Sequence, residues 1–565
     1  MQPADDPVVD FKRAGYGVPS KVRLRCPSPI ARRSVIAAPK RFPQGGDAPL
    51  RGPYFTTMRQ REILGKLRDG ASGVEVWRWA RALALLAALV HFLLVLFVVI
   101  SRINYRYDLE WLEGASLHQV YRAYMGQSLY VQPSLEYIAL PYTPLYFYLA
   151  ALFVNITGLS FLPLRLISFL SAVGCMLIIY RAVESSTSSE PAAFAAAGAF
   201  AATFMLGGAW FDIARVDMLF VFLCLAGVFA LGRQTTSTSM LAGFLFACAL
   251  MTKQTTLPFL ALIGGATLLL FRRQSIPLVG SFALLALLAY WYLAASTGGW
   301  FQYYTVRLAG IHDVAWSLTP SVVSGAFGVV TVWVLVGLAP LILGFRLVLA
   351  DRLHLYYYIA VAGLIGASIF GRLIVGAYNN ALVPAYAGLS LLFGLGLGWL
   401  TSPGHIRIAR PGTYRLALWL TVLLQFAVLA YDPTPQIPTR ADRKAGDALV
   451  ARLQSGPGDV LVPFHNYLGL FAGKKVWLHL TMLNEIRGFY SGSGGQPGLR
   501  EVREQLRSTP FGMIMLDQPY DLMDRKQCAR TEVIEYESIR SFYPVAGDIY
   551  RPTILYIDCA GNGSP

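Results

Sequence analysis

Long apolar runs constrain this chain more than any other feature of its sequence. They are close to 20 residues long with no charge in their middle, and they lie at about 80–101, 163–183, 191–209, 218–232, 238–252, 257–271, 275–296, 321–345, 355–370, 380–400 and 413–431. As a helix, each run is about long enough to cross the ~30 Å hydrocarbon core of a bilayer. Only 14% of the 565 residues are charged, whereas a soluble protein has roughly 25%. The sequence therefore predicts an all-α polytopic membrane protein with about eleven transmembrane helices.

Positive charge is concentrated ahead of the first run. The formal net charge is +16, and residues 1–78 hold 15 Lys and Arg against 7 Asp and Glu, so +8 of the excess lies there. These residues are rich in Pro, Gly and Arg and lack a helical or strand period, although a helix-compatible stretch opens at Met58, an alternative start. We expect a disordered basic cytosolic tail over 1–78 that follows the positive-inside rule. Nucleic acid is not expected as a partner.

The orientation of the chain depends on the short, aromatic-rich segment 141–158. If this segment lies flat at the membrane interface, the cytoplasmic ends of the spans carry a cluster of arginines: Arg181, Arg233, Arg272, Arg273, Arg346, Arg352, Arg407 and Arg410. If it spans the membrane, the cluster moves outside. The positive-inside rule favours the first arrangement. We therefore expect a plasma-membrane protein with a cytoplasmic N-terminus, a transmembrane domain over 79–431 and an outer C-terminal domain.

Residues 432–565 regain charge and contain apolar runs of strand length at 459–464, 513–516 and 553–557, preceded by a helical pattern at 441–454. This composition predicts a small α/β domain, which is large enough to bury a core of its own. Cys528 and Cys559 are its only cysteines. An outer compartment is oxidising, and two paired strands would bring these cysteines together, so we expect a disulfide between them. Two free thiols are the alternative.

In this topology most of the remaining charged and polar residues gather on the outer face. They are Asp108, Glu110 and Glu113 after the first span, Asp212, Arg215 and Asp217 before the fourth, Lys253, then Arg307, His312 and Asp313, and Arg372, Tyr378, Asn379 and Asn380. A carboxylate at a membrane surface can accept a proton from an attacking hydroxyl, and cations beside it can hold a leaving phosphate. Sugar transfer from a lipid phosphate fits this set.

Each of these residues also has a structural interpretation. The carboxylates could form a solvated loop, Lys253 could simply reach toward the headgroups, and Arg215 could join a structural ion pair. Asn379 could cap a helix end. No metal site is demanded, although paired acidic loops could hold a divalent ion.

The order of the first motifs resembles the GT-C glycosyltransferases, especially the aminoarabinose transferases acting on lipid A and the protein O-mannosyltransferases. The segments YDLEWLEGASLHQVYRAYMGQSLY, LPYTPLYFYLAALF and LPLRLISFLSAVG are similar to the N-terminal module of that superfamily. Asp108, Gly126, Pro144 and Arg165 match its pattern. This resemblance implies a GT-C-like membrane domain with Asp108 as the catalytic base.

Later segments extend the resemblance over roughly residues 80–400. Asp217 in RVDML matches the second acidic position of the superfamily, and MTKQTTLPFLAL places Lys253. GRLIVGAYNNALVPAYAGLSLL points to Arg372 and Tyr378, which with Lys253 are the implied ligands of the donor phosphate. Arg165, Arg215, His312 and Asn379 are further candidates for substrate binding.

The resemblance implies a polyprenyl-phosphate-linked monosaccharide donor, an inverting single displacement, and an envelope glycan, lipid or protein as acceptor, with membrane lipids around the enzyme. Two departures matter. The adjacent Asp-Glu of the superfamily is here Asp-Leu-Glu, so Glu110 or Glu113 could partner Asp108. The family lysine near Pro144 has no counterpart in LPYTP.

Two other functions compete with this one. A multi-span transporter or lipid flippase would need charged residues at mid-span, where His91 is the main ionisable residue. A binding protein with an outer recognition domain is the third possibility. The sequence predicts neither the sugar nor the acceptor.

Overall fold

The computed structural model describes the backbone of residues 54–405, 409–489, 495–520, 528–538 and 541–559, with side chains from Val76 onward. The chain divides into two units, Met1–Gly65 and Lys66–Pro565. The architecture below is that of the second unit, apart from the start of its first helix.

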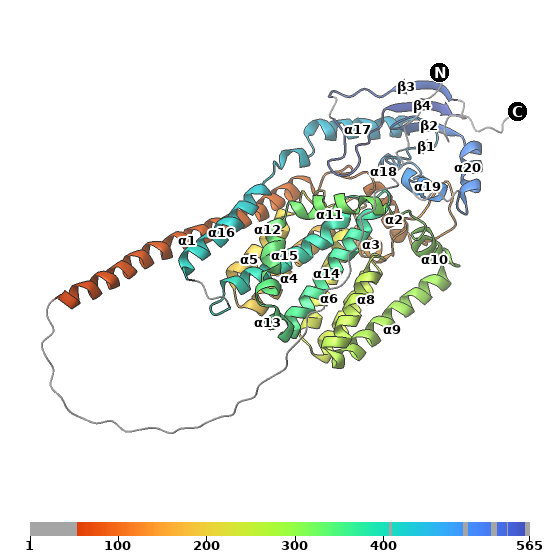
Figure 1. Cartoon of the computed structure of the whole chain (residues 1–565). Coiled ribbons are helices and arrows are strands. Elements are labelled where there is room, and N and C mark those ends of the chain that lie inside the picture. The colour runs from red at the N-terminus through yellow and green to blue at the C-terminus, as the bar shows by residue number, and fades with distance from the viewer. Residues whose placement is uncertain (1–53, 406–408, 490–494, 521–527, 539–540, 560–565) are drawn as a thin grey trace, which may run out of the picture. The chain divides into compact units, whose positions relative to one another are not determined.

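Helices make up most of the described chain (Figure 1). Those of the first half are α1 (Tyr54–Arg102), α2 (Glu113–Tyr124), α3 (Leu145–Thr157), α4 (Leu162–Thr187), α5 (Glu190–Ala202), α6 (Asp217–Gly232), α7 (Thr236–Leu250), α8 (Thr256–Leu270) and α9 (Arg272–Ser296). They are followed by α10 (Trp300–Gln302), the π-helix Tyr303–Leu308, α11 (Thr319–Gly328), α12 (Thr331–Leu343), α13 (Phe345–Ala350), α14 (Arg352–Leu373), α15 (Val383–Thr401) and α16 (Pro411–Val428).

Every predicted apolar run forms helix, yet the eleven predicted spans are not all long enough to cross a membrane. Within the described residues, five helices have the length and hydropathy of a span, namely Val76–Arg102, α4, α9, α14 and Asn379–Thr401. A sixth arises if the pair around α11 and α12, bent by 88°, counts as one span. Helices α6, α7 and α8 have only 15 or 16 residues, about 22–24 Å of rise. Hydropathy detects an apolar run but not the point at which its helix ends.

One predicted boundary also changes, and one short predicted segment can be located. Helix α1 begins at Tyr54, inside the segment predicted as a disordered tail, because the stretch around Met58 is compatible with helix. Most of the predicted tail, residues 1–53, lies outside the described residues. Segment 141–158 forms the 13-residue α3, which is shorter than a span, and its position at the membrane interface stays a prediction.

Helix α15 lies at the centre of the helical domain, and 94% of the most apolar stretch of Asn379–Thr401 is buried. Its run Gly394-Leu-Gly-Leu-Gly398 permits close packing. A Cβ at Gly394 would lie 2.5 Å from Ala196 Cβ, and one at Gly396 would lie 2.1 Å from the carbonyl oxygen of Val336. The glycines therefore let helices α5 and α12 approach the backbone of α15.

The predicted C-terminal α/β domain is present. Its elements are α17 (Arg440–Ser455), β1 (Val460–Leu461), α18 (Tyr467–Phe471), α19 (Leu480–Arg487), α20 (Leu499–Ser508), β2 (Phe511–Leu516), β3 (Cys528–Val533) and β4 (Ile554–Cys559). The sheet has the order β1-β2-β4-β3, with β1 parallel to β2 and the other pairs antiparallel (Figure 1). Cys528 pairs with Cys559 across β3 and β4, and the predicted disulfide joins them.

Candidate active site

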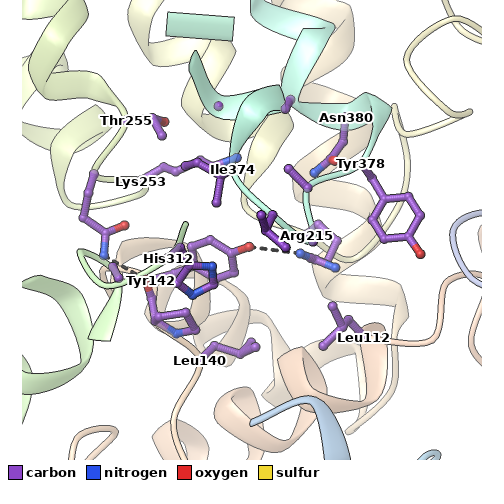
Figure 2. A pocket seen from close by; sticks show the side chains of 18 of the residues that line it. Leu112, Leu140, Tyr142, Arg215, Lys253, Thr255, His312, Ile374, Tyr378 and Asn380 are labelled. Atoms are coloured by element: carbon purple, nitrogen blue, oxygen red, sulfur yellow. Dashed lines mark hydrogen bonds between the residues drawn. The ribbon is translucent and has the colours of Figure 1, made fainter. Parts of the chain in front are cut away.

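A cavity of about 610 Å³ lies where the predicted outer loops meet the C-terminal domain. Its walls come from the loops after α1, α5, α7 and α14, the segment before α3, the loop after the π-helix, the end of α14, the start of α8, α19 and Asp548. Figure 2 labels several of these lining residues. Of the predicted site residues, Arg215, Lys253, His312 and Tyr378 line it. The tertiary fold thus brings together four loops that lie far apart in the sequence.

The first ion pair joins Arg215, which lines the cavity, to Glu110, which is fully buried behind that lining. Arg215 Nη1 donates to Glu110 Oε2 at 2.9 Å, and Nη2 donates to the Tyr142 hydroxyl at 3.1 Å (Figure 2 shows the second bond). Among the described residues, no donor reaches the other oxygen, Oε1, in hydrogen-bonding geometry. Burial raises the pKa of Glu110 to about 7, against the opposing effect of Arg215. The charged and neutral forms of this carboxyl group therefore differ little in free energy near neutral pH.

The second ion pair joins Lys253 to Asp217. Their charged atoms are 2.5 Å apart, and the Trp210 indole N–H donates to the other carboxylate oxygen at 3.2 Å. Asn380 also lies against Asp217 and lines the cavity. The Asp217 carboxylate begins α6, where the N-terminus of the helix favours negative charge. Lys253 thereby presents its ammonium to the cavity from a fixed position.

The loop after α14 supplies only part of what the sequence predicts. Tyr378 lines the cavity, lies against the Asp548 carboxylate and stacks on Trp210 with ring centroids 6.5 Å apart. Asn379 is exposed, and its neighbour Asn380 lines the cavity instead. Arg372 does not line the cavity, although Gly371 and Ile374 do. Successive residues of a helix differ in direction by about 100°, so Arg372 does not share the direction in which Gly371 meets the cavity.

His312 contacts α19 of the C-terminal domain. Its Nε2 lies 2.7 Å from Glu485 Oε2, and both residues line the cavity. Burial lowers the pKa of His312, but the hydrogen bond and charge of Glu485 outweigh it and leave the pKa raised. This pair closes one wall of the cavity between the two domains.

Asp108, the predicted base, lies outside the cavity lining and is enclosed by the C-terminal domain. His465 Nδ1 lies 2.7 Å from Asp108 Oδ2, and the Tyr467 hydroxyl donates to Oδ1 at 2.5 Å. The other ring nitrogen of His465 lies 3.0 Å from Asp517. Burial lowers the pKa of His465, but the charges of Asp517 and Asp108 outweigh it and raise the pKa to about 10. A charged His465 therefore links the first outer loop to the sheet.

Glu113 and Arg165 form a fully buried pair rather than a substrate site. Arg165 donates to both carboxylate oxygens, at 3.1 and 2.6 Å, and to the carbonyl oxygens of Tyr105 and Tyr107. The backbone N–H of Ala214 also donates to Glu113. Both side chains have 0% exposure. The pair fixes the loop between α1 and α2.

Sequence reasoning missed His465, Asp517 and Asp548. His465 and Asp517 follow β1 and β2, two parallel strands whose carboxyl ends share one edge of the sheet. Polar residues at that edge are the usual ligand contacts of an α/β sheet, so their place after the strands was an available signal. No local pattern marks Asp548. In the described part of the chain, no three or more His, Cys, Asp or Glu residues are grouped as metal ligands.

Comparison with known proteins identifies the fold. Residues 141–296 match the model of the dolichyl-phosphate-mannose-protein mannosyltransferase family. The crystal structure of ArnT from Cupriavidus metallidurans in the apo state has a TM-score of 0.54 at 11% identity, covering 83% of this chain and 97% of ArnT. The chain has the GT-C fold. The resemblance seen in the sequence is thereby confirmed at the level of fold.

Further solved structures were also matched. ArnT bound to undecaprenyl phosphate matches with a TM-score of 0.52 at 11% identity and the same coverage. The apo oligosaccharyltransferase of Archaeoglobus fulgidus has a TM-score of 0.47 at 11% identity, covering 78% of this chain and 69% of that protein. No curated protein sequence matches the chain.

Proposed function

We propose that this protein is a membrane glycosyltransferase that moves a monosaccharide from a polyprenyl-phosphate donor to an envelope acceptor on the outer face of the membrane. The observation that carries the proposal is the pair of carboxylate–cation contacts, Glu110–Arg215 and Asp217–Lys253, in which both cations line one cavity and both carboxylates are buried behind them. A base and phosphate ligands are what such a transfer needs.

Glu110 replaces Asp108 as the proposed base. Both oxygens of Asp108 are held by His465 and Tyr467, whereas Glu110 keeps one oxygen without a donor among the described residues. In the proposed step, the acceptor oxygen bonds to the anomeric carbon as the bond from that carbon to the phosphate oxygen breaks. The hydroxyl proton passes to Glu110, and polyprenyl phosphate leaves with inversion at the anomeric carbon.

Lys253 and Arg215 are the proposed ligands of the leaving phosphate. Each is already paired with a carboxylate, which fixes its position, and each remains partly accessible at the cavity, with side-chain exposures of 15% and 7%. A preorganised cation stabilises the charge that grows on the phosphate during transfer. We propose that these two cations suffice without a metal, so EDTA should leave transfer unchanged.

The test is transfer from radiolabelled polyprenyl-phosphate sugars by protein purified in detergent. Glu110→Gln should lower the rate at least ~100-fold, the usual contribution of a general base. Glu136→Gln is the matched control, because Glu136 lies in the outer region between α2 and α3 but pairs with Lys475 at an exposed site. No transfer by the wild-type protein from a broad donor panel would favour a transporter instead.

The proposed orientation places the N-terminus in the cytoplasm and the cavity outside. Reporter fusions after Phe271 and Arg410 should then report cytoplasm, and fusions after Gly299 and Asp432 should report the outer side. A cytoplasmic C-terminal domain would contradict both the orientation and the proposed site of transfer.

A further inference from the structure

The C-terminal domain touches the proposed base directly, through a short segment that begins at Ala546. The Ala546 N–H donates to the carbonyl oxygen of Leu109 at 3.0 Å, and Ala546 pairs with Glu110 in a parallel β-bridge. A chain segment more than 430 positions away thus forms backbone contacts with the loop that carries Glu110.

Gly547 leaves the space that the Glu110 side chain occupies. A Cβ at Gly547 would lie 2.9 Å from Cγ of Glu110 and 3.3 Å from its Oε1, closer than ordinary van der Waals contact. The oxygen involved is the one with no donor in the described part of the chain. Any side chain at this position would therefore push the carboxylate.

The next residue enters the cavity. Asp548 lines it and lies against Tyr378 from the transmembrane domain. Two residues later, the ring of Tyr550 packs on Trp111 with centroids 4.7 Å apart, and Trp111 also lines the cavity. An anionic carboxylate repels a phosphate but accepts hydrogen bonds from hydroxyl groups, so Asp548 suits a hydroxyl-bearing substrate group.

We propose that the segment 546–548 completes the catalytic centre, with Ala546 and Gly547 positioning Glu110 and Asp548 binding a hydroxyl of the acceptor. This inference rests on the proposed glycosyl transfer and extends it. The C-terminal domain is then a part of the acceptor site, and the donor phosphate is held by the transmembrane domain alone.

The positioning role is tested with Gly547→Ala against Gly473→Ala. Both glycines have positive φ, +74° and +69°, but a Cβ at Gly473 meets nothing within 4 Å. Backbone strain is therefore matched, and only the contact with Glu110 differs. Gly547→Ala should lower kcat on the order of 10²-fold, as for a displaced catalytic group, and should shift the acid limb of the pH–rate profile. Gly473→Ala should do neither.

A rescue experiment separates positioning from misfolding. Glu110→Asp is shorter by one methylene and withdraws from the position that the new Cβ occupies. Adding Glu110→Asp to Gly547→Ala should therefore cost less than it costs in the wild-type background. An additive or larger loss would overturn the positioning role.

The acceptor role is tested with Asp548→Asn. It should raise the acceptor KM roughly 10- to 100-fold, through loss of a charge-assisted hydrogen bond, and leave the donor KM unchanged. Asp558→Asn, at an exposed position of β4, is the control. A raised donor KM would overturn the assignment to the acceptor.

The failure of this inference can be told from the failure of the proposed function. If the wild-type protein is active and Gly547→Ala is unimpaired, the inference alone is overturned. If the wild-type protein is inactive with every donor, the proposed function is overturned as well.

Discussion

Two sets of ion pairs lie at the end of the helical domain that faces the C-terminal domain, and they differ in how many protein groups surround each cation. In the deeper set, Arg165 pairs with Glu113 and Arg102 pairs with Asp212, and all four side chains have 0% exposure. These arginines also donate to backbone carbonyl oxygens. They have little left to offer a substrate.

The second set lies at the cavity. Arg215 and Lys253 each pair with one carboxylate but keep side-chain exposures of 7% and 15%. Both sets pair basic side chains with one Asp and one Glu, so residue type alone does not separate the structural pairs from those at the cavity. The two sets are distinguished by the number of protein groups around each cation, because a cation that is fully coordinated by protein cannot also bind a phosphate.

The largest expected effect comes from breaking a structural pair. Arg165→Met leaves Glu113 buried without its cation, and removing one partner of a buried pair costs about 3–5 kcal/mol of unfolding free energy. Thermal unfolding can be followed through reaction of a thiol dye with the buried Cys175 and Cys224. The double variant Arg165→Met with Glu113→Gln should be more stable than Arg165→Met alone. A single variant as stable as the wild type would remove the distinction between the two sets.

Breaking a cavity pair should affect transfer more than folding. Lys253→Met keeps most of the side-chain length but removes the charge, and a lost charge-assisted contact costs about 1.5–3 kcal/mol. The donor kcat/KM should fall accordingly, by roughly 10- to 150-fold, while the acceptor KM stays constant. An increase in the acceptor KM alone would show that Lys253 does not bind the phosphate.

The pH dependence of transfer tests the role of Glu110 in the pair that it forms with Arg215. The pKa of Glu110 is raised to about 7 by burial, and a base acts only when deprotonated. The value of kcat/KM should therefore fall as pH drops below about 7, approaching tenfold per pH unit. Glu110→Gln should abolish this limb in the residual activity. A limb that persists in this variant would assign the titration to another group.

The smallest effect is expected at Arg372, which belongs to neither set. It is partly exposed at the end of α14 and does not line the cavity. Arg372→Ala should change the donor kcat/KM within about twofold, as is usual for a substitution away from a site. A loss similar to that of Lys253→Met would restore Arg372 as a phosphate ligand.

Much of the fold could be predicted from local patterns. Apolar runs predict helices because burial or a membrane is required to cover them, and the strand-length runs at 459–464, 513–516 and 553–557 correspond to β1, β2 and β4. Helix ends are less predictable. The run 191–209 reads as one span, but α5 ends at Ala202, since hydropathy does not change where the backbone turns.

The candidate site also has a part that the sequence predicts and a part that it does not. The loops that carry charge were predicted, and Asp217, Lys253, Arg215 and Tyr378 do contribute to one cavity or its ion pairs. Which carboxylate serves as base could not be predicted. Asp108, Glu110 and Glu113 lie within six residues of one another, yet their partners come from three different parts of the chain.

The sequence by itself determined that this chain is largely helical with long apolar runs, that an α/β domain follows them, and which loops hold its charges; it also favoured the pairing of Cys528 with Cys559, which the structure confirms. Those properties follow from hydropathy, charge and spacing, which are local. Only the tertiary structure decided that His465 encloses Asp108, that Arg165 neutralises Glu113, and that Gly547 makes room for Glu110. These contacts join residues separated by 52 to more than 430 positions, and the environment of a carboxylate depends on what packs around it.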